Sequence, residues 1–342
     1  LADTIAGLRS AAPLTDVARE LHEGRYRRIV LTGMGSSFYA AHPLALRLSA
    51  AGLWAAEAET SELNYYYPAW LAPDSLLVAI SQSGASAETV RLLALSQHSC
   101  GKHPSPFPLP SRGEGKVTVA GVTNEAESPL ARAADVTVLM RAGHEASVSC
   151  KTYLATLAAL TWLGDQLLPE EPPWLPHIGG AIPAVAAYLA NWQSHVAWLQ
   201  ETLRGVRQLY LVGRGPSLAT VGTGGLILKE STHLPAEGLS SAAFRHGPFE
   251  IVSPQTYVLG FAGAEATAAL NAHLIADVLA AGGRGALVGP DGEGAFAIPP
   301  VPEPALPIVE MLPVQMMTLA LAALQGFEPG RFALGSKVTT VE

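Results

Sequence analysis

The chain has few cysteines and few charged residues. Cys100 and Cys150 are its only cysteines among 342 residues, and two cysteines make neither a disulfide framework nor a zinc-binding pattern. We therefore expect a reducing, cytoplasmic compartment and no bound metal. Charged residues amount to 15% of the chain and the net charge is −8, so the sequence lacks the basic patch that a nucleic-acid surface needs.

The first residues show no pattern of a secretory leader, and the sequence has no long hydrophobic run. Its first residues, LADTIAGLRSAAPLTDVARE, show no basic segment followed by an apolar core, so no signal peptide is expected. The most apolar stretches, LATLAALTWLG and MMTLALAALQGF, are too short to span a bilayer and are typical of core helices. With 49% hydrophobic residues, the chain has enough apolar surface and enough length for two ordinary domains.

Two segments share one layout of strand, glycine turn and helix. They are RRIVLTGMGSSFYAAHPLALRL (27–48) and RQLYLVGRGPSLATVGTGGLIL (207–228). Two glycines and a serine recur in them at the same spacing, as Gly33, Gly35 and Ser37 and as Gly213, Gly215 and Ser217. Further short apolar runs follow at 76–80, 117–124 and 135–140 in the first half, and at 257–263 and 286–290 in the second. Such runs alternating with helical patterns predict a duplicated α/β fold whose parallel sheets are covered on both faces.

Composition divides the chain into five segments. These are an N-terminal helical arm (1–24), a first α/β domain (25–165), a linker with a proline-rich stretch and one helix (166–206), a second α/β domain (207–328) and a tail (329–342). Within the first domain, HSCGKHPSPFPLPSRGEGK (98–116) has many prolines and little periodicity. We interpret it as a flexible insertion rather than a functional lid.

The stretch SQSGASAET (81–89) stands where an apolar run turns into a helix. Ligands bind at the carboxyl ends of parallel strands, where a helix N-terminus offers unpaired N–H groups. Hydroxyl donors at such a turn can hold a phosphate monoester without a cation, and Gly84 lets the backbone approach it. The candidate phosphate ligands are Ser81, Gln82, Ser83 and Ser86, with Ser37 from the neighbouring glycine turn. The alternative is that these serines only cap helices.

A nucleotide site is not expected at either glycine turn. GMGSS and GRGPS both fail to complete G-x-G-x-x-G, because Phe38 or Leu218 holds the last position, and no G-x-x-x-x-G-K-[ST] occurs.

These motifs resemble the sugar isomerase (SIS) domain family. SQSGASAET is similar to that family's phosphate loop and GMGSS to its first glycine turn, which implies that Gly35, Ser36 and Gly84 line the substrate. The resemblance covers residues 25–342 and implies two tandem SIS domains, each a parallel β-sheet between helices. The whole is similar to the isomerase half of glucosamine-6-phosphate synthase. We expect no glutaminase domain before the arm, which favours the stand-alone double-SIS enzymes.

The same resemblance assigns three catalytic residues. LKES (228–231), FRHGPFE (244–250) and SKVTTVE at the C-terminus match the family's segments. They imply that Glu230 moves a proton between C1 and C2, that His246 assists ring opening, and that Lys337 approaches the carbonyl carbon, including as an imine. Each residue also has a structural alternative, namely an ion pair with a neighbouring lysine, a turn hydrogen bond and a solvated charge.

A further stretch, HEASVSCKTY (144–153), resembles a substrate-lining V-S-T-K-T-Y segment. It implies that Val148, Ser149 and Lys151 line the substrate, while Cys150 replaces a hydroxyl residue and is expected to pack rather than to act as a nucleophile. Ile227 and Ala243 depart from the family pattern, which leaves the sugar specificity open.

The resemblance implies a cytoplasmic enzyme that converts glucosamine 6-phosphate into fructose 6-phosphate and ammonia without a cofactor or metal. It further implies a homodimer whose histidine loop serves the neighbouring subunit, with no nucleic-acid or membrane partner. One alternative is a deglycase or isomerase of another ketosamine or hexose phosphate. Another is a phosphosugar-binding regulator, although residues 1–24 are too few for a DNA-binding unit.

Overall fold

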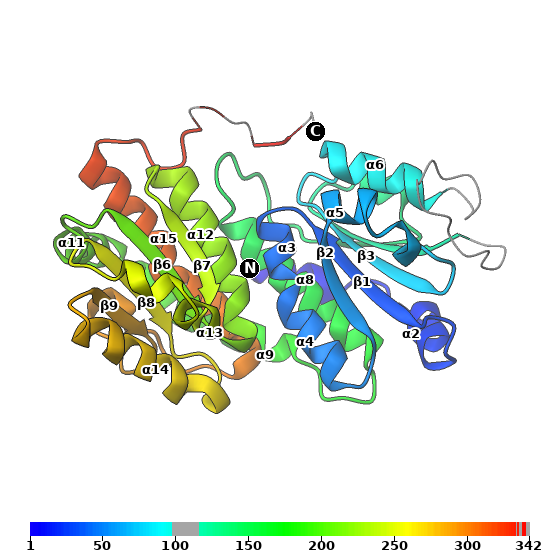
Figure 1. Cartoon of the computed structure of the whole chain (residues 1–342). Coiled ribbons are helices and arrows are strands. Elements are labelled where there is room, and N and C mark those ends of the chain that lie inside the picture. Colours follow the sequence, from blue (N-terminus) through cyan, green and yellow to red (C-terminus); the bar gives the residue numbers. More distant parts are fainter. Residues whose placement is uncertain (98–115, 333, 335–336, 340–342) are drawn as a thin grey trace. The chain divides into compact units, whose positions relative to one another are not determined.

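The computed structural model describes residues 1–97, 116–332, 334 and 337–339 (Figure 1). The chain forms two compact units. The first consists of Leu1–His144, Lys151–Leu175 and the chain from Val338, and the second consists of Glu145–Cys150 and Pro176–Lys337. The predicted insertion 98–116 lies outside the described residues except for Lys116. The domain boundaries drawn from the sequence stay a prediction.

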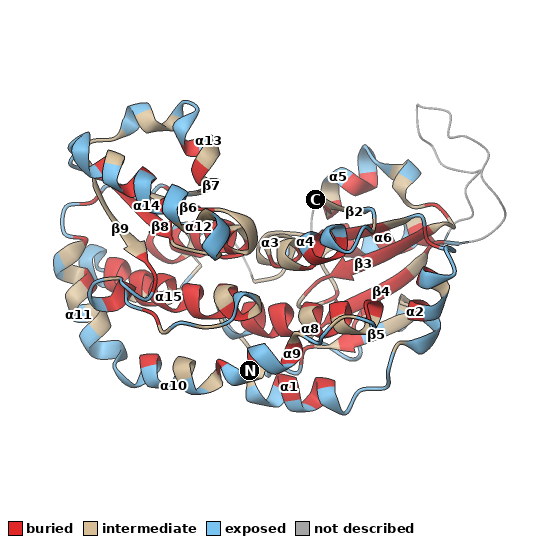
Figure 2. Cartoon of the chain, turned by 90° about the horizontal axis from the view of Figure 1, so that it is seen from below, coloured by how far each residue is buried: buried red, intermediate tan, exposed pale blue. Residues whose placement is uncertain are grey.

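The first unit is built on a parallel sheet. In the described residues its strands are β1 (Arg28–Gly33), β2 (Ala55–Glu59), β3 (Ser75–Ile80), β4 (Thr118–Thr123) and β5 (Val136–Leu139), in the order β2-β1-β3-β4-β5. Val30, Leu77 and Val119 stand in register across three of these strands. Figure 2 shows β3 and β4 buried along their length, as continuous apolar runs predict.

Helices cover both faces of this sheet. They are α1 (Ala2–Arg9), α2 (Thr15–His22), α3 (Ser36–Ala40), α4 (His42–Ala50), α5 (Thr60–Tyr65), α6 (Ala87–Ser96), α7 (Pro129–Ala133) and α8 (Lys151–Leu167), with the 3-10 helix η1 (Pro68–Trp70). On one face, α5, α6 and α7 bury Leu63, Leu92 and Leu130 against Leu77 and Val119. On the other, α3 and α4 pack against α8, which also contacts β4 and β5. The predicted two-sided covering of a parallel sheet is confirmed.

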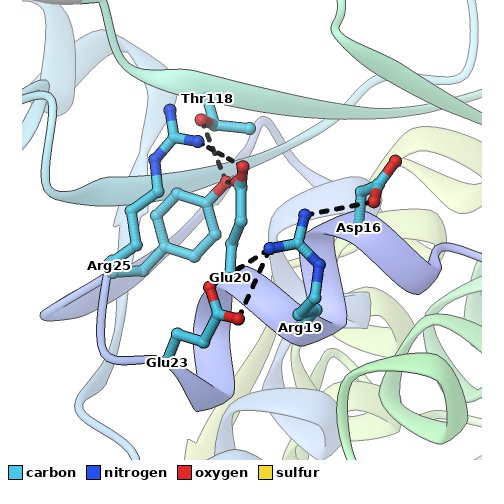
Figure 3. Close-up of polar contacts among 7 residues, drawn as sticks. Asp16, Arg19, Glu20, Glu23, Arg25 and Thr118 are labelled. Carbon is cyan, nitrogen blue, oxygen red and sulfur yellow. Dashed lines mark hydrogen bonds and ion pairs between the residues drawn. The ribbon is translucent and has the colours of Figure 1, made fainter.

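Within the first unit, polar contacts connect α2 of the N-terminal arm with the sheet (Figure 3). The Tyr26 hydroxyl donates to Glu20 of α2 and lies 3.2 Å from the Thr118 hydroxyl of β4. This hydrogen bond lowers the pKa of the Glu20 carboxyl, while burial raises that of the Tyr26 phenol. Arg19 forms exposed ion pairs with Asp16 and Glu23, which contribute little because solvent screens them.

The second unit repeats the strand order of the first. Within the described residues, β6 (Gln208–Gly213), β7 (Ala236–Ser240), β8 (Thr256–Phe261) and β9 (Arg284–Val288) form a parallel sheet in the order β7-β6-β8-β9. On one face, α13 (Ser241–Arg245) and α14 (Glu265–Ala280) bury Phe244, Leu274 and Val278 against the sheet. On the other, α12 (Leu218–Thr232) lies against β6 and β7 and packs on α15 (Leu306–Gln325).

The segment predicted as one linker helix is broken into two, α10 (Ile182–Ala190) and α11 (Trp192–Thr202). The proline-rich stretch before it also contains a short helix, α9 (Leu175–Gly180). The break falls at Asn191, whose ψ of 17° departs from helical geometry and whose N–H bonds Tyr188 O at 3.1 Å. Tyr188, near the end of α10, donates its hydroxyl proton to Ala295 O at 2.7 Å. Trp198 of α11 meets Phe296 of η4 (Gly294–Phe296) edge-on, at 5.3 Å between ring centroids.

Among the described residues, the segment Glu303–Gln325 is the one helical stretch apolar and long enough to cross a bilayer. It comprises η5 (Glu303–Ala305) and α15, and 83% of its most apolar window is buried in the protein (Figure 2). A central core helix has the same composition, and this burial agrees with the expectation of a core helix for MMTLALAALQGF.

Candidate active site

The first glycine turn follows β1 directly. A Cβ at Gly33 would lie 2.9 Å from the backbone nitrogen of Phe38, so only glycine fits where the chain turns back into α3. Gly35 has a φ of +53°, which favours glycine for a second reason. The turn leaves Gly35, Ser36 and Ser37 half-buried at the carboxyl end of β1. Three of the predicted site residues therefore lie together at this turn.

The loop 81–86 joins β3 to α6, and its hydroxyl groups are held by the loop's own backbone. Ser81 Oγ accepts the Gly84 N–H at 3.1 Å, and Ser83 Oγ accepts the Ala85 N–H at 3.3 Å. Ser86 Oγ caps α6 by accepting the Thr89 N–H at 3.3 Å. Ser81 and Ser83 accept in this way and keep their hydroxyl protons available for a ligand, whereas Ser86 Oγ also lies 2.8 Å from Thr89 Oγ1 and shares a hydrogen bond with it. The capping alternative and the phosphate-binding role are thus compatible.

Both turns lie at the same edge of the first sheet. β1 and β3 are adjacent and parallel, so Ser37 and the loop 81–86 emerge at neighbouring carboxyl ends. The structure brings the five predicted phosphate ligands to this edge. The first N–H of α6, from Ala87, donates to the carbonyl of Thr339 at 3.1 Å, so part of the C-terminal tail also lies at this loop.

A second group of predicted residues gathers in the second unit around Lys337. The Lys337 ammonium lies 3.4 Å from Glu145 Oε2 and donates to the carbonyl of Ser147. The side chains of Lys337 and Glu145 are 25% and 7% exposed, so the pair is largely removed from water. Glu145 Oε1 also accepts the Cys150 N–H at 3.0 Å, which fixes the segment 145–150.

Glu230, on α12, belongs to the same group. Burial raises the pKa of its carboxyl, and the positive charges of Lys337 and then Lys229 oppose that rise. A carboxyl with a raised pKa next to an ammonium is suited to take up and return a proton. Burial, reinforced by the negative charge of Glu145, raises the pKa of Cys150 to about 11, so its thiol is not a nucleophile at neutral pH.

His246 is not joined to this group. It ends α13 on an exposed turn, where its backbone N–H donates to Ala243 O at 2.9 Å. Within the described part of the chain, no hydrogen bond or ion pair connects its ring with Glu230 or Lys337. Of the predicted lining residues, Val148 is buried and Ser149 half-buried beside Glu145, and the exposed Lys151 begins α8 in the first unit.

Glu145 is the residue that the sequence analysis did not single out. The sequence contains one clue to its role. Glu145 is the acidic residue closest to the VSCK stretch, which resembles a substrate-lining segment. No cluster of three or more His, Cys, Asp or Glu side chains able to hold a metal ion occurs in the ranges that the structure describes.

The comparison with known sequences points to one group of enzymes. No protein-family model matches the chain. The glutamine–fructose-6-phosphate aminotransferase (isomerizing) of Pyrococcus horikoshii is 32% identical over an alignment of 331 residues, which covers 93% of this chain and 52% of that protein. The chain therefore spans about half the length of the curated relatives that it matches.

Solved structures share the fold over nearly the whole chain. The C-terminal domain of glucosamine-fructose-6-phosphate aminotransferase from Francisella tularensis superposes with a TM-score of 0.80 at 21% identity, covering 96% of this chain and 94% of that one. Glucosamine-6-phosphate deaminase from Thermotoga maritima gives a TM-score of 0.75 at 17% identity, with 99% of each chain covered.

The fold is thus the sugar isomerase (SIS) fold of the phosphosugar isomerases. The homologues are the isomerase half of the glutamine–fructose-6-phosphate aminotransferases, which confirms the resemblance drawn from the sequence motifs.

Proposed function

We propose that the chain is an amino-sugar-phosphate isomerase with two tandem SIS domains. It interconverts glucosamine 6-phosphate with fructose 6-phosphate and ammonia. The observation that carries the proposal is the partly buried carboxyl of Glu230. Burial raises the pKa of this carboxyl, and the positive charge of Lys337 acts against that rise. A proton-transfer base of this kind is what aldose–ketose isomerisation requires.

In the proposed reaction, the hydroxyls of Ser37 and of the loop 81–86 hold the phosphate of the substrate. Anchoring the phosphate fixes the sugar carbons, because binding energy at a remote group is used for positioning. His246 moves the proton that opens the pyranose ring and exposes the C1 aldehyde.

Glu230 then removes the proton from C2 and returns it to C1, while the nearby ammonium of Lys337 stabilises the negative charge on the C1 oxygen. The amino nitrogen gives up one proton and the C1 oxygen takes one up, so the product is a C2 imine of fructose 6-phosphate. Water adds to this imine, and ammonia leaves from C2. The reverse sequence adds ammonia to fructose 6-phosphate, so one set of residues serves both directions.

The exposure of His246 supports a homodimer in which this residue completes the site of the partner subunit. The dimer, a cytoplasmic location and a reaction without metal or cofactor remain parts of the proposal. The small-molecule partner is a sugar phosphate.

A second candidate is the isomerase half of a glutamine-dependent aminotransferase, which the identity to the Pyrococcus horikoshii enzyme favours. It would use the same residues in the direction of synthesis. The two candidates differ in the source of ammonia, since the aminotransferase would take it from glutamine.

The test is the production of ammonia and fructose 6-phosphate from glucosamine 6-phosphate by the purified chain. We expect equal amounts of the two products, and loss of turnover with retained substrate binding in Glu230→Gln. Glu201→Gln, an exposed carboxylate on α11, is the matched control and should leave the rate unchanged.

If the chain releases no ammonia from glucosamine 6-phosphate but isomerises another hexose phosphate or ketosamine phosphate, that compound would take the place of glucosamine 6-phosphate as the proposed substrate. Saturable binding of sugar phosphates without any turnover would overturn the enzyme and favour a phosphosugar-binding regulator.

A further inference from the structure

The second unit contains a cavity of about 300 Å³ that the proposed reaction does not use. It lies at the carboxyl edge of the second sheet, lined by residues that follow β8 and β9 and by the start of α15. Three carboxylates line it, Glu265, Glu303 and Glu310, and no basic side chain does so in the part of the chain that the structure describes.

Glu310 is the most deeply buried of the three carboxylates, with 1% of its surface exposed. Its Oε1 accepts the hydroxyl of Ser217 at 2.8 Å. Its Oε2 is buried and has no hydrogen-bond partner among the described residues. A buried carboxylate oxygen without a partner is costly and uncommon in native proteins, and a bound ligand is one way to satisfy it.

This carboxylate occupies the position in the second unit that corresponds to the proposed phosphate site of the first unit. Ser217 is the counterpart of Ser37 in the duplicated sequence, and Gly263 follows β8 as the loop 81–86 follows β3. Gly263 has a φ of +69°, and a Cβ there would lie 2.9 Å from Ser217 Oγ, so the loop passes close to this serine. In the second unit the serine hydroxyl is committed to a carboxylate. When Glu310 is ionised, this edge of the sheet would therefore repel a phosphate and attract a cation.

We propose that this cavity is a second ligand site, which binds a small polar molecule through a primary ammonium group that donates to Glu310 Oε2. A charge-assisted hydrogen bond of this kind satisfies the buried oxygen and neutralises the carboxylate at once. Burial raises the pKa of Glu310 to about 7, and the hydroxyls of Ser217 and then Thr220 oppose that rise, so the carboxyl can ionise near neutral pH when a cation is supplied.

A metal ion is a poorer occupant. Among the described residues, the acidic side chains of the cavity do not form a cluster of three that could ligate one. The cavity also has room for more than a single ion, and its lining beside the carboxylates is mainly apolar or backbone, including Val288, Pro290 and Leu306. The site does not rest on the catalytic proposal, because none of its lining residues belongs to the group around Glu230 and Lys337.

The test uses glucosamine as the ammonium probe and glucose as its neutral match, since the two differ in the group at C2. Binding to the full chain is measured by calorimetry, in the presence of saturating fructose 6-phosphate to occupy the proposed catalytic site. We expect glucosamine to bind and glucose to bind at least about tenfold more weakly. Equal affinity for the two sugars would overturn the proposal.

Two variants connect the binding to the cavity. Glu310→Gln keeps the size of the side chain and removes its charge, and it should weaken glucosamine binding at least about tenfold. Ala264→Leu narrows the cavity without altering a polar group, and it should weaken glucosamine binding even if Glu310→Gln fails to fold.

Unchanged glucosamine affinity in either folded variant would overturn the site. Binding of fructose 6-phosphate and turnover of glucosamine 6-phosphate are measured on the same samples. If the unaltered chain shows neither this binding nor this turnover, the proposed function is rejected. The measurements of glucosamine binding at the cavity can still be interpreted in that case.

Discussion

Burial and neighbouring charge act in opposite directions on the carboxyl of Glu230. Burial favours the protonated form, and the ammonium groups of Lys337 and Lys229 favour the ionised form. The balance decides the pH at which Glu230 can act as a base, so each lysine contributes to the pH profile of the proposed reaction even where it does not touch the substrate.

Lys229 offers a test of this balance, because it is exposed and stands outside the proposed catalytic group. In Lys229→Met the pKa of Glu230 should rise, since a positive charge that lowers it is lost. A base acts in its ionised form, so the acidic limb of kcat/KM against pH should move to higher pH while the rate plateau stays unchanged. Lys116→Met, in the first unit, is the control. An unmoved limb in Lys229→Met would show that Glu230 is not the titrating base.

The thiol of Cys150 should be unreactive in the folded chain. Its pKa of about 11 means that little thiolate exists near pH 8, and the thiolate is the form that alkylating reagents attack. In a Cys100→Ser background, iodoacetamide should label Cys150 far more slowly in the native protein than in denaturant. Labelling at equal rates would contradict both the burial and the influence of the carboxylates.

At the residue scale, the sequence allowed most of the candidate site to be predicted but not the partner of Lys337. The hydroxyls of the loop 81–86 and the acid Glu230 occur in motifs, so local sequence is enough to find them. Glu145 meets Lys337 through a contact that joins distant parts of the chain. No local pattern carries that information.

At the scale of elements, strands were predictable where the sequence contains a short apolar run, including the edge strands β5 and β9. β3 and β4 lie inside the sheet, and their apolar runs predict them as strands. β2 and β7 also lie at sheet edges, but they read AAEAE and AEGLS and contain no apolar run. They form because the neighbouring β1 and β6 offer backbone hydrogen bonds, and a reading of hydrophobic runs does not detect this.

The loop between β3 and α6 depends on Gly84. Its φ is +61°, and a Cβ would lie 2.3 Å from Ser128 Oγ. Gly84→Ala should destabilise the protein by roughly 1–3 kcal/mol, from backbone strain plus the displacement of Ser128. It should also weaken the binding of sugar phosphates.

Gly24→Ala separates the two contributions to this effect. Gly24 also has a positive φ, of +79°, but a Cβ there would meet no atom within 4 Å. This variant should therefore lose less stability and should bind sugar phosphates normally. The measurement is urea unfolding together with calorimetric binding of fructose 6-phosphate. Equal losses in the two variants would exclude the contact with Ser128 as a cause.

At the scale of the whole molecule, the proposed dimer predicts complementation between inactive variants. His246→Ala and Lys337→Ala should each abolish turnover alone. If His246 acts in the site of the partner subunit, a mixed dimer contains one complete site. An equal co-expression of both variants should then restore about a quarter of the activity, since half of the dimers are mixed. No recovery in purified mixed dimers would place His246 in the site of its own subunit or outside catalysis.

The path of the chain sets a limit on how this molecule can be divided. Glu145–Cys150 belongs to the second unit although it precedes the last helix of the first, and the chain from Val338 belongs to the first although it follows the second. If the chain were split into two pieces within residues 176–180, the lysine of the tail would therefore lie on one piece and its acidic partner, Glu145, on the other. The two repeats visible in the sequence are consequently not interchangeable modules, and any recombination that shuffles them must carry the 145–150 segment and the tail along with it.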